Sequence, residues 1–328
     1  IHGVAGVLPR VIRARELGLR FCVIPEENIR EGNLVKDMPV FGVKSLNAMI
    51  RCLRDPNTYT AAYQEKEKTE NKPEIPKVDF ADICGQEGAR RAAEIAVSGF
   101  HNILFIGPPG SGKTMLAGRL PTIMPEMTFE ESLEITKVYS VAGLLTEKDP
   151  LIRQRPFRSP HHTSSSAALA GGGRIPGPGE VTLAHRGVLF LDEMPEFARG
   201  SLEVLRQPLE DKQIQLSRAS GTYVFPAGFI LVAAMNPCPC GYYPDMNKCR
   251  CTPGEVSHYL HKLSQPLLER IDLCADVPPV NFSQISGEKS GESSALIRKR
   301  VEKARKIQQK RYQNEKICFN GELSGKQI

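Results

Sequence analysis

The strongest indication of the fold is the segment Gly107-Pro108-Pro109-Gly110-Ser111-Gly112-Lys113-Thr114. It fits the pattern G-x-x-x-x-G-K-[ST], in which backbone N–H groups wrap a phosphate. An apolar segment at residues 103–106, typical of a buried strand, runs straight into it, and residues 115–120 continue as a helix. This strand–loop–helix context favours a phosphate-binding loop over an ordinary glycine-rich turn before a helix.

The residue types of this loop suit ATP with Mg²⁺. Glycines let the backbone approach a phosphate because they carry no Cβ, and the following helix adds the positive end of its dipole. Lys113 is expected to bridge the β- and γ-phosphates, and Thr114 to place its hydroxyl on Mg²⁺. All residues of the loop, 107–114, are therefore candidate nucleotide-binding residues.

A second apolar strand ends in two carboxylates. Residues 188–191 read VLFL, and Asp192 and Glu193 follow directly. Because ligands of open α/β sheets bind at the carboxyl ends of strands, Asp192 is expected to hold Mg²⁺ through water. Glu193 is expected to act as the general base for the attacking water. The alternative is a pair of solvated acids after a strand.

Two further polar residues follow apolar segments. Residues 229–234 form a third apolar strand that leads to Asn236, whose amide can hydrogen-bond both a γ-phosphate and the attacking water. Arg270 lies between apolar flanks in the segment LLERID at residues 267–272. Phosphoryl transfer uses a fixed guanidinium to stabilise transition-state charge. The alternative for Arg270 is a surface salt bridge with Glu269 or Asp272.

Short apolar strands alternate with helical stretches from residue 78 onward, which predicts an α/β fold with a central parallel sheet flanked by helices. Residues 1–55 are expected to form a partial small α/β domain, with helices near 11–19 and 45–53 and a strand near 20–24. Residues 56–78 are expected to be a linker, because they are rich in Glu, Lys and Pro. Residues 79–280 are then the core, and 281–328 the start of an incomplete helical lid.

The composition excludes several classes of protein. With 41% hydrophobic and 24% charged residues, the chain is neither disordered nor collagen-like. No apolar run approaches the ~18–20 residues that span a bilayer, and residues 1–8 lack the features of a signal peptide. Nine cysteines, an odd number, favour a reducing compartment, so we expect a cytoplasmic protein. The net charge of +6 permits a polyanionic partner without requiring one.

Residues 295–316 have the pattern of a basic amphipathic helix, with nine Lys or Arg against two acids. Leu296, Val301, Ala304 and Ile307 recur at helical spacing. One interpretation packs this apolar stripe on the body and leaves the cationic face in water. The other gives the helix a contact with nucleic acid or a partner.

Four cysteines form the pattern C-x-C-x8-C-x-C: Cys238, Cys240, Cys249 and Cys251. Four thiolates suit tetrahedral Zn²⁺, and such a site is structural because it leaves no open coordination position. A reduced hairpin without metal and redox pairing of the thiols are the alternatives.

These elements, in this order, resemble an AAA+ P-loop ATPase of the branch that contains magnesium-chelatase subunits and MCM helicases. Residues 82–87, DICGQE, resemble the adenine-side box ahead of the phosphate loop. Residues 155–193, RPFRSPHHTSSSAALAGGGRIPGPGEVTLAHRGVLFLDE, are similar to the ComM/YifB family of magnesium-chelatase-like proteins. NPCPCGYY at 236–243 and KLSQPLLERIDL at 262–273 match the same family.

The resemblance implies that the subunits assemble into a ring, which we expect to be a hexamer. It implies that Asn236 is sensor 1, that Arg270 is an arginine finger reaching the neighbouring subunit, and that Ile83 and Gly85 lie on the adenine side. Residues 6–31 resemble the end of a Lon-type protease domain without its catalytic lysine, hence a non-proteolytic remnant. The lid of such proteins continues past residues 323–324 to a sensor 2 arginine, which this sequence does not contain.

Two insertions match features of this family and are candidates for contact with DNA. Residues 159–179, rich in Gly, Ser and Pro with Arg174 near the centre, match the helix-2 insert. Residues 212–226 match the pre-sensor-1 hairpin, with strands at 213–217 and 222–225. Arg174, Lys212 and Arg218 are the candidate DNA contacts in a ring pore. Alternatively the insertions are ordinary surface loops, and His161 and His162 are interpreted as structural.

Three functions fit these observations. The first is a ComM-type ring motor that uses ATP to translocate on single-stranded or branched DNA, as in branch migration during recombination or DNA uptake. The second is the ATPase motor of a magnesium-chelatase-type complex, which drives metal insertion into a porphyrin. The third is a nucleotide-gated scaffold that binds DNA or protein without unwinding.

Overall fold

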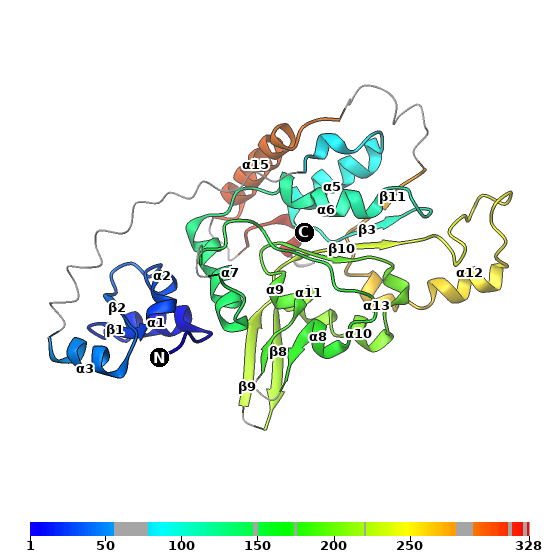
Figure 1. Ribbon diagram of the computed structural model, residues 1–328. Coiled ribbons are helices and arrows are strands. Elements are labelled where there is room, and N and C mark those ends of the chain that lie inside the picture. Colours follow the sequence, from blue (N-terminus) through cyan, green and yellow to red (C-terminus); the bar gives the residue numbers. More distant parts are fainter. Residues whose placement is uncertain are drawn as a thin grey trace. The chain divides into compact units, whose positions relative to one another are not determined.

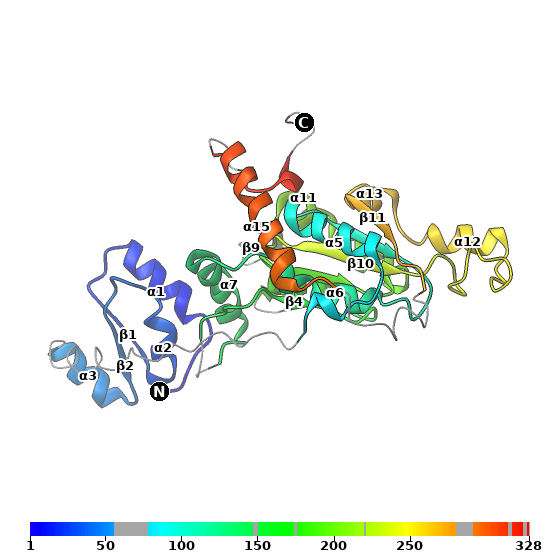
Figure 2. The same cartoon turned by 90° about the horizontal axis from the view of Figure 1, so that it is seen from above.

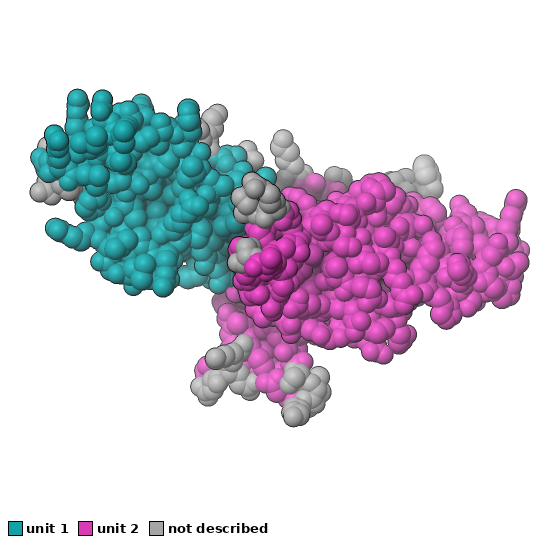
Figure 3. Space-filling model, turned by 90° about the horizontal axis from the view of Figure 1, so that it is seen from below, with its two compact units in different colours: residues 1–75, 127–154 teal, residues 76–126, 155–328 magenta. Residues whose placement is uncertain are grey.

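The structure, a computed structural model, describes residues 1–55, 78–146, 150–173, 176–219, 221–279, 291–313, 317–323 and 327. The chain divides into two compact units, residues 1–75 with 127–154 and residues 76–126 with 155–328 (Figure 3). Each unit has a hydrophobic core of its own. The predicted linker lies outside the described residues except for Val78, and so does the predicted start of the lid at 281.

A five-stranded sheet forms the centre of the larger unit, in the order β11-β3-β10-β7-β4 (Figure 1). The strands are β3 (Ile103–Ile106), β4 (Phe157–Arg158), β7 (Val188–Leu191), β10 (Ile230–Met235) and β11 (Leu273–Asp276). Every pairing between neighbours is parallel, so the carboxyl ends of all five strands meet at one edge. The predicted α/β fold is confirmed, and the edge strands β4 and β11 are additions to the three predicted strands.

Helices cover both faces of this sheet, as predicted. In β3, Ile103 and Phe105 belong to one core and Leu104 to the other. Figure 2 shows the helices of the first core lying over the strands: α5 (Glu87–Gly99), α6 (Lys113–Ile123) and α15 (Ser294–Arg311). The second core is completed by α8 (Ser166–Ala170), α9 (Glu180–Leu183), α10 (Arg199–Glu203), α11 (Arg206–Asp211) and α13 (Gln265–Leu268).

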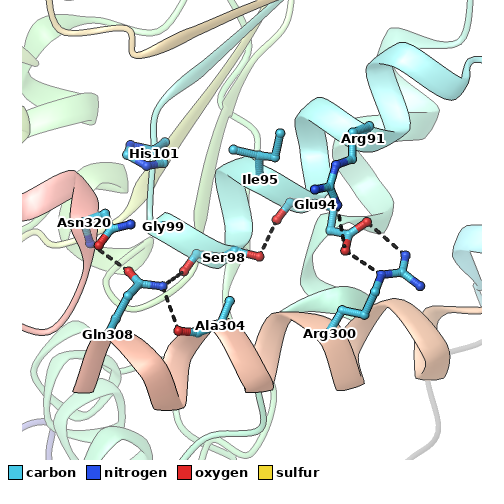
Figure 4. A pocket seen from close by; sticks show the side chains of 10 residues that line it. All are labelled: Arg91, Glu94, Ile95, Ser98, Gly99, His101, Arg300, Ala304, Gln308 and Asn320. Atoms are coloured by element: carbon cyan, nitrogen blue, oxygen red, sulfur yellow. Dashed lines mark hydrogen bonds and ion pairs between the residues drawn. The ribbon is translucent and has the colours of Figure 1, made fainter. Parts of the chain in front are cut away.

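The basic helix α15 is fixed to α5 by polar contacts (Figure 4). Arg300 donates to both carboxylate oxygens of Glu94, at 2.7 and 2.9 Å, and Gln308 Nε2 donates to Ser98 O at 2.8 Å. The bonds from Arg300 hold the pKa of the buried Glu94 carboxyl below its usual range. These contacts bind one polar side of the helix to the body, and the hollow that Figure 4 shows there holds none of the predicted site residues.

The predicted apolar stripe of α15 is partly wrong. Val301 is buried, but Leu296 and Ile307 are 51% and 60% exposed. The buried line instead joins Ile297 and Val301 to Gln308. The face of α15 that carries Gln308 lies against α5, where Gln308 Nε2 donates to Ser98 O.

The smaller unit contains the N-terminal segment and one later helix. Its elements are α1 (Val7–Glu16), β1 (Cys22–Pro25), η1 (Glu26–Asn28), α2 (Ile29–Gly32), β2 (Val40–Val43), α3 (Leu46–Arg54) and α7 (Phe129–Ala142). The helices and strand expected in residues 1–55 are present, shifted by a few positions. Buried Glu31 joins two of the helices, because it accepts from Leu8 N at 2.8 Å and from Ser140 Oγ of α7. A segment within the predicted 79–280 range thus packs with the N-terminal residues.

The remaining elements of the larger unit are short. They are η2 (Phe80–Asp82), β5 (Gly171–Gly172), β6 (Gly177–Pro178), η3 (Met194–Glu196), β8 (Gln213–Arg218), β9 (Gly221–Pro226), α12 (Pro253–Leu260) and η4 (Asn320–Glu322). β8 and β9 pair antiparallel, which confirms the predicted hairpin. In the described part of the chain, no helix combines the length and the apolar character that crossing a membrane requires.

Candidate nucleotide site

The predicted phosphate loop connects β3 to α6 with the backbone that anion binding requires. Gly112 precedes α6 in a left-handed conformation, φ 93°, which glycine adopts without strain. At Gly107, a Cβ would lie 2.1 Å from the carbonyl oxygen of Val277, so only glycine fits. Ser111 Oγ is buried and has no hydrogen-bond partner among the described residues. The loop therefore keeps a buried hydroxyl available for a ligand.

The Lys113 ammonium is buried inside this loop. Its Nζ donates to Gly107 O at 2.7 Å, to Pro108 O at 2.9 Å and to Asn236 Oδ1 at 3.1 Å. Burial lowers the pKa of Lys113, and the charges of Asp192 and Glu193 oppose that effect. All three acceptors are neutral, so an anionic ligand here would gain a buried positive charge as its partner.

The two predicted Mg²⁺ residues lie together. Thr114, at the start of α6, donates its hydroxyl to Asp192 Oδ2 at 2.7 Å. Asp192 follows β7, and β10 lies between β7 and β3 in the sheet. Parallel pairing thus places the loop, the acids and Asn236 at the same edge. Glu193 is next to Asp192, with a left-handed φ of 50° and a side chain that is 58% exposed.

His162 lies beside Glu193, a neighbour that sequence reasoning missed. Its Nδ1 is 3.5 Å from Glu193 Oε2. The centroids of the His162 and His161 rings are 4.1 Å apart. The register of the sheet explains the meeting: Arg158 pairs with Leu189 in parallel, and His162 and Glu193 each stand four residues later. Only that strand pairing, which the sequence does not show, could have indicated the contact.

The segment that resembles the adenine-side box lies against the phosphate loop. Ile83 is buried, at 3% exposure, and Gly85 turns the chain with φ 62°. The following residue, Gln86, donates its Nε2 to Ser111 O at 3.2 Å and also to Pro278 O. Ile83 and Gly85 therefore remain candidates for the base side of the site.

Arg270 lies at the amino ends of the strands, whereas the phosphate loop lies at their carboxyl ends. Its carbonyl accepts from Asn102 Nδ2 at 2.8 Å, and Asn102 precedes β3, whereas the phosphate loop follows β3. The guanidinium pairs with Glu210 of α11 and donates to Pro266 O. Neither of the acids named in the alternative is its partner in the structure. Arg270 is thus not brought together with the other site residues of its own subunit.

Comparison with known proteins identifies the family to which this chain belongs. The family described as "Magnesium chelatase, subunit ChlI" matches residues 79–285. The competence protein ComM of Haemophilus influenzae is 44% identical over 95% of this chain and 61% of its own length. The YifB protein of Escherichia coli is 42% identical, over 95% of this chain and 60% of its own. This chain belongs to the magnesium-chelatase-like ComM/YifB family.

The magnesium-chelatase-like family is of the AAA+ ATPase type, and membership implies the use of a nucleotide and Mg²⁺. An uncharacterized protein of Mycobacterium tuberculosis is 43% identical over 99% of this chain and 64% of its own length. The chain therefore spans somewhat less than two thirds of the length of these relatives.

The insertions predicted at residues 159–179 and 212–226 lie against each other through residues that the structure describes. A Cβ at Gly172 would stand 3.4 Å from Arg218 Nη2, and one at Gly171 would stand 3.3 Å from Leu216 Cδ1. Arg218, near the end of the hairpin, is exposed. Lys212 is at its base, where Nζ donates to Leu209 O at 3.0 Å and burial lowers its pKa.

This placement of Lys212 does not suit the predicted DNA contact, because its ammonium is partly buried and already caps a helix. Arg174 lies outside the described residues. Of the three candidate DNA contacts, Arg218 alone has an exposed position in the described part of the chain.

The four clustered cysteines converge just after Asn236. The Sγ atoms of Cys238 and Cys240 are 3.4 Å apart, those of Cys240 and Cys249 are 3.6 Å apart, and those of Cys238 and Cys249 are 3.8 Å apart. With Cys251, all four sulfurs lie within 4.8 Å of one another. The spacing C-x-C-x8-C-x-C thus brings four potential ligands to one point.

Proposed function

We propose that this chain is the ATP-hydrolysing part of a ring-forming motor that acts on DNA, of the ComM type. One observation supports it most: residues that follow three separate strands meet at one sheet edge. Lys113 donates a hydrogen bond to Asn236, Thr114 donates one to Asp192, and Glu193 follows Asp192 directly. A cation for the phosphates, two Mg²⁺ ligands and a carboxylate base are the groups that γ-phosphate hydrolysis uses.

The residues of this edge fit ATP and Mg²⁺. The free Ser111 hydroxyl, the glycine backbone and Lys113 supply donors for the β- and γ-phosphates. Thr114 would hold Mg²⁺ through its hydroxyl and Asp192 through water. The bound ion supplies charge neutralisation for the phosphate oxygens.

The remaining polar groups would act on the attacking water. Glu193 is placed to accept its proton as general base. His162, 3.5 Å from that carboxylate, would keep Glu193 in one orientation. Asn236 would orient the water and the γ-phosphate through the amide that now bonds Lys113.

The β8–β9 hairpin supports DNA as the substrate polymer. Most of its side chains are exposed, although Ile214 is buried and Leu216 and Phe225 pack partly buried against the second core. A two-stranded hairpin with little packing is marginally stable alone. Residues 212–226 carry no acid, and their exposed cation is Arg218, which complements a phosphate backbone. In a ring, each subunit would present Arg218 to a strand in the pore. The name of one relative, a competence protein, agrees with a role in DNA uptake.

The ATPase motor of a metal chelatase is the second candidate, because the matching family carries that description. Such a motor would respond to its protein partners and would be indifferent to DNA.

The function is tested by the ATPase rate of the full-length protein without DNA, with single-stranded DNA and with branched DNA. We expect branched DNA to stimulate hydrolysis several-fold and to be unwound or migrated. Arg218→Ala should weaken DNA binding and lower the slope of log K against log salt by about 1 for each phosphate that the arginine neutralises. Arg13→Ala, at a similarly exposed arginine of the smaller unit, is the matched control.

Lys113→Ala should be inactive with every DNA, because the loop loses its cation. A rate that ignores DNA would contradict the DNA motor and favour the chelatase motor. Hydrolysis with DNA binding but without strand displacement would favour a nucleotide-gated scaffold.

We also propose that the cysteine cluster holds structural Zn²⁺. Four thiolates at Zn–S bonds of about 2.3 Å stand roughly 3.8 Å apart, close to the observed 3.4–3.8 Å. All nine cysteines are free in the described chain, which suits the cytoplasmic location that we propose.

Elemental analysis of reduced protein should find one zinc per chain. Cys240→Ser should release it because one thiolate ligand is removed, whereas Cys274→Ser, at an exposed cysteine outside the cluster, should retain it. Freshly reduced wild-type protein without metal would exclude the zinc site.

A further inference from the structure

The four-cysteine segment, residues 238–251, has little hydrophobic core of its own. Its buried cluster consists of cysteines and Val256. Its largest side chains point outward instead: Tyr242, Tyr243 and Met246 are 42%, 46% and 74% exposed. A short segment of this kind is ordered mainly by its metal, because metal binding replaces the missing apolar burial. Whatever this segment holds in place therefore depends on the metal.

One part of the segment packs on the phosphate loop. A Cβ at Gly241 would lie 2.5 Å from Pro109 Cδ and 3.8 Å from Asn236 Cγ. Gly241 has a left-handed φ of 86°, and its N donates to Cys238 O at 3.0 Å. The turn that starts at the first cysteine thus sets Gly241 directly against the loop that carries the phosphates.

A second contact returns to Asn236. This residue stands two positions before Cys238, and its amide accepts from Lys113 at 3.1 Å. The backbone of Asn236 is close enough to the Tyr259 hydroxyl to lower its pKa, against the larger effect of burial, which raises it. Tyr259 is a buried residue of α12, which begins just after the last cysteine. The segment therefore leaves the sheet at the nucleotide edge, and the helix that follows it contacts the same edge.

We propose that the metal-bound segment is a positioning element of the nucleotide site, which holds Pro109 and Asn236 in place. The proposal rests on the ATP and zinc sites proposed above. Loss of the metal should leave the sheet folded, because the two large cores contain none of the four cysteines. It should release Gly241 from Pro109 and so disorder the loop. Nucleotide binding by this ATPase is thereby made dependent on zinc and on reduced thiols.

The metal arm of the test measures affinity for a non-hydrolysable ATP analogue by calorimetry, before and after zinc is removed by a chelator under reducing conditions. We expect affinity to fall by roughly tenfold and hydrolysis by up to about a hundredfold, the cost of a misplacement near 1 Å. Adding zinc back should restore both. Circular dichroism checks that the zinc-free protein is folded. Unchanged affinity in folded, zinc-free protein would overturn the proposal.

The contact arm leaves the cysteines intact. Gly241→Ala places a methyl group against Pro109, so zinc content should stay at one per chain while nucleotide affinity falls. In a Pro109→Ala background the ring atoms in its way are gone, so the same substitution should cost much less, as a double-mutant cycle detects. Gly18→Ala controls for backbone strain, since Gly18 has φ 69° and open space around it.

Equal losses from Gly241→Ala in both backgrounds would overturn the contact. Wild-type protein that holds zinc but binds no nucleotide would instead refute the proposed ATP site. Protein that binds nucleotide at full affinity without any zinc would refute the dependence on metal.

Discussion

Glu193→Gln should keep ATP bound while hydrolysis falls by about 10²–10⁴-fold, the contribution that a general base typically makes. The substitution preserves the size of the side chain and removes its ability to accept a proton. The groups proposed to bind the nucleotide stay intact: Lys113 in the loop and the Thr114–Asp192 pair at 2.7 Å. Single-turnover hydrolysis and analogue binding, measured on the same preparation, separate the two effects.

Glu196→Gln is the matched control for this variant. Glu196 stands three residues further along and is exposed, and its carboxylate pairs with Lys262 at 3.0 Å. If carboxylates in this segment act only through surface charge, the two variants should lose similar activity. A Glu193→Gln protein that turns over within a few-fold of wild type would rule out Glu193 as the base.

The sequence could predict the parts of the site that are local in the chain. The loop at residues 107–114 is flanked by its own strand and helix, so one short sequence pattern is enough to locate it. Asp192 and Asn236 each follow an apolar strand, and parallel pairing brings such ends to one edge. The structure brings both to Lys113 and Thr114, as these patterns indicate.

Contacts that depend on register or packing could not be predicted in this way. His162 meets Glu193 because the two-residue strand β4 pairs with β7, and a strand so short has no apolar pattern. Glu210, the partner of Arg270, comes from a helix about sixty residues earlier in the chain. The packing of α7 with the N-terminal segment follows from tertiary contacts such as Ser140 with Glu31, which leave no periodic trace.

Arg270→Ala should lose about 10³-fold or more in hydrolysis, the loss known for arginine fingers, with ATP binding retained. The position of Arg270 argues that it serves a neighbour. It lies where β3 and β11 begin, with Leu273 paired to Ile103, whereas the phosphate loop leaves β3 after Ile106. The length of the strand, about 13 Å at ~3.3 Å per residue, separates it from its own nucleotide loop. A catalytic Arg270 must therefore act in trans.

The deciding experiment mixes two inactive proteins, Lys113→Ala and Arg270→Ala. In a mixed ring, some interfaces join the intact loop of one subunit to the intact arginine of another, and these should recover part of the activity. Glu210→Ala is the companion variant, since it breaks the ion pair and leaves the guanidinium present. A finger predicts that Glu210→Ala stays active. A structural ion pair predicts that both variants lose the same, and that mixed rings, once shown to assemble, remain as inactive as their parents.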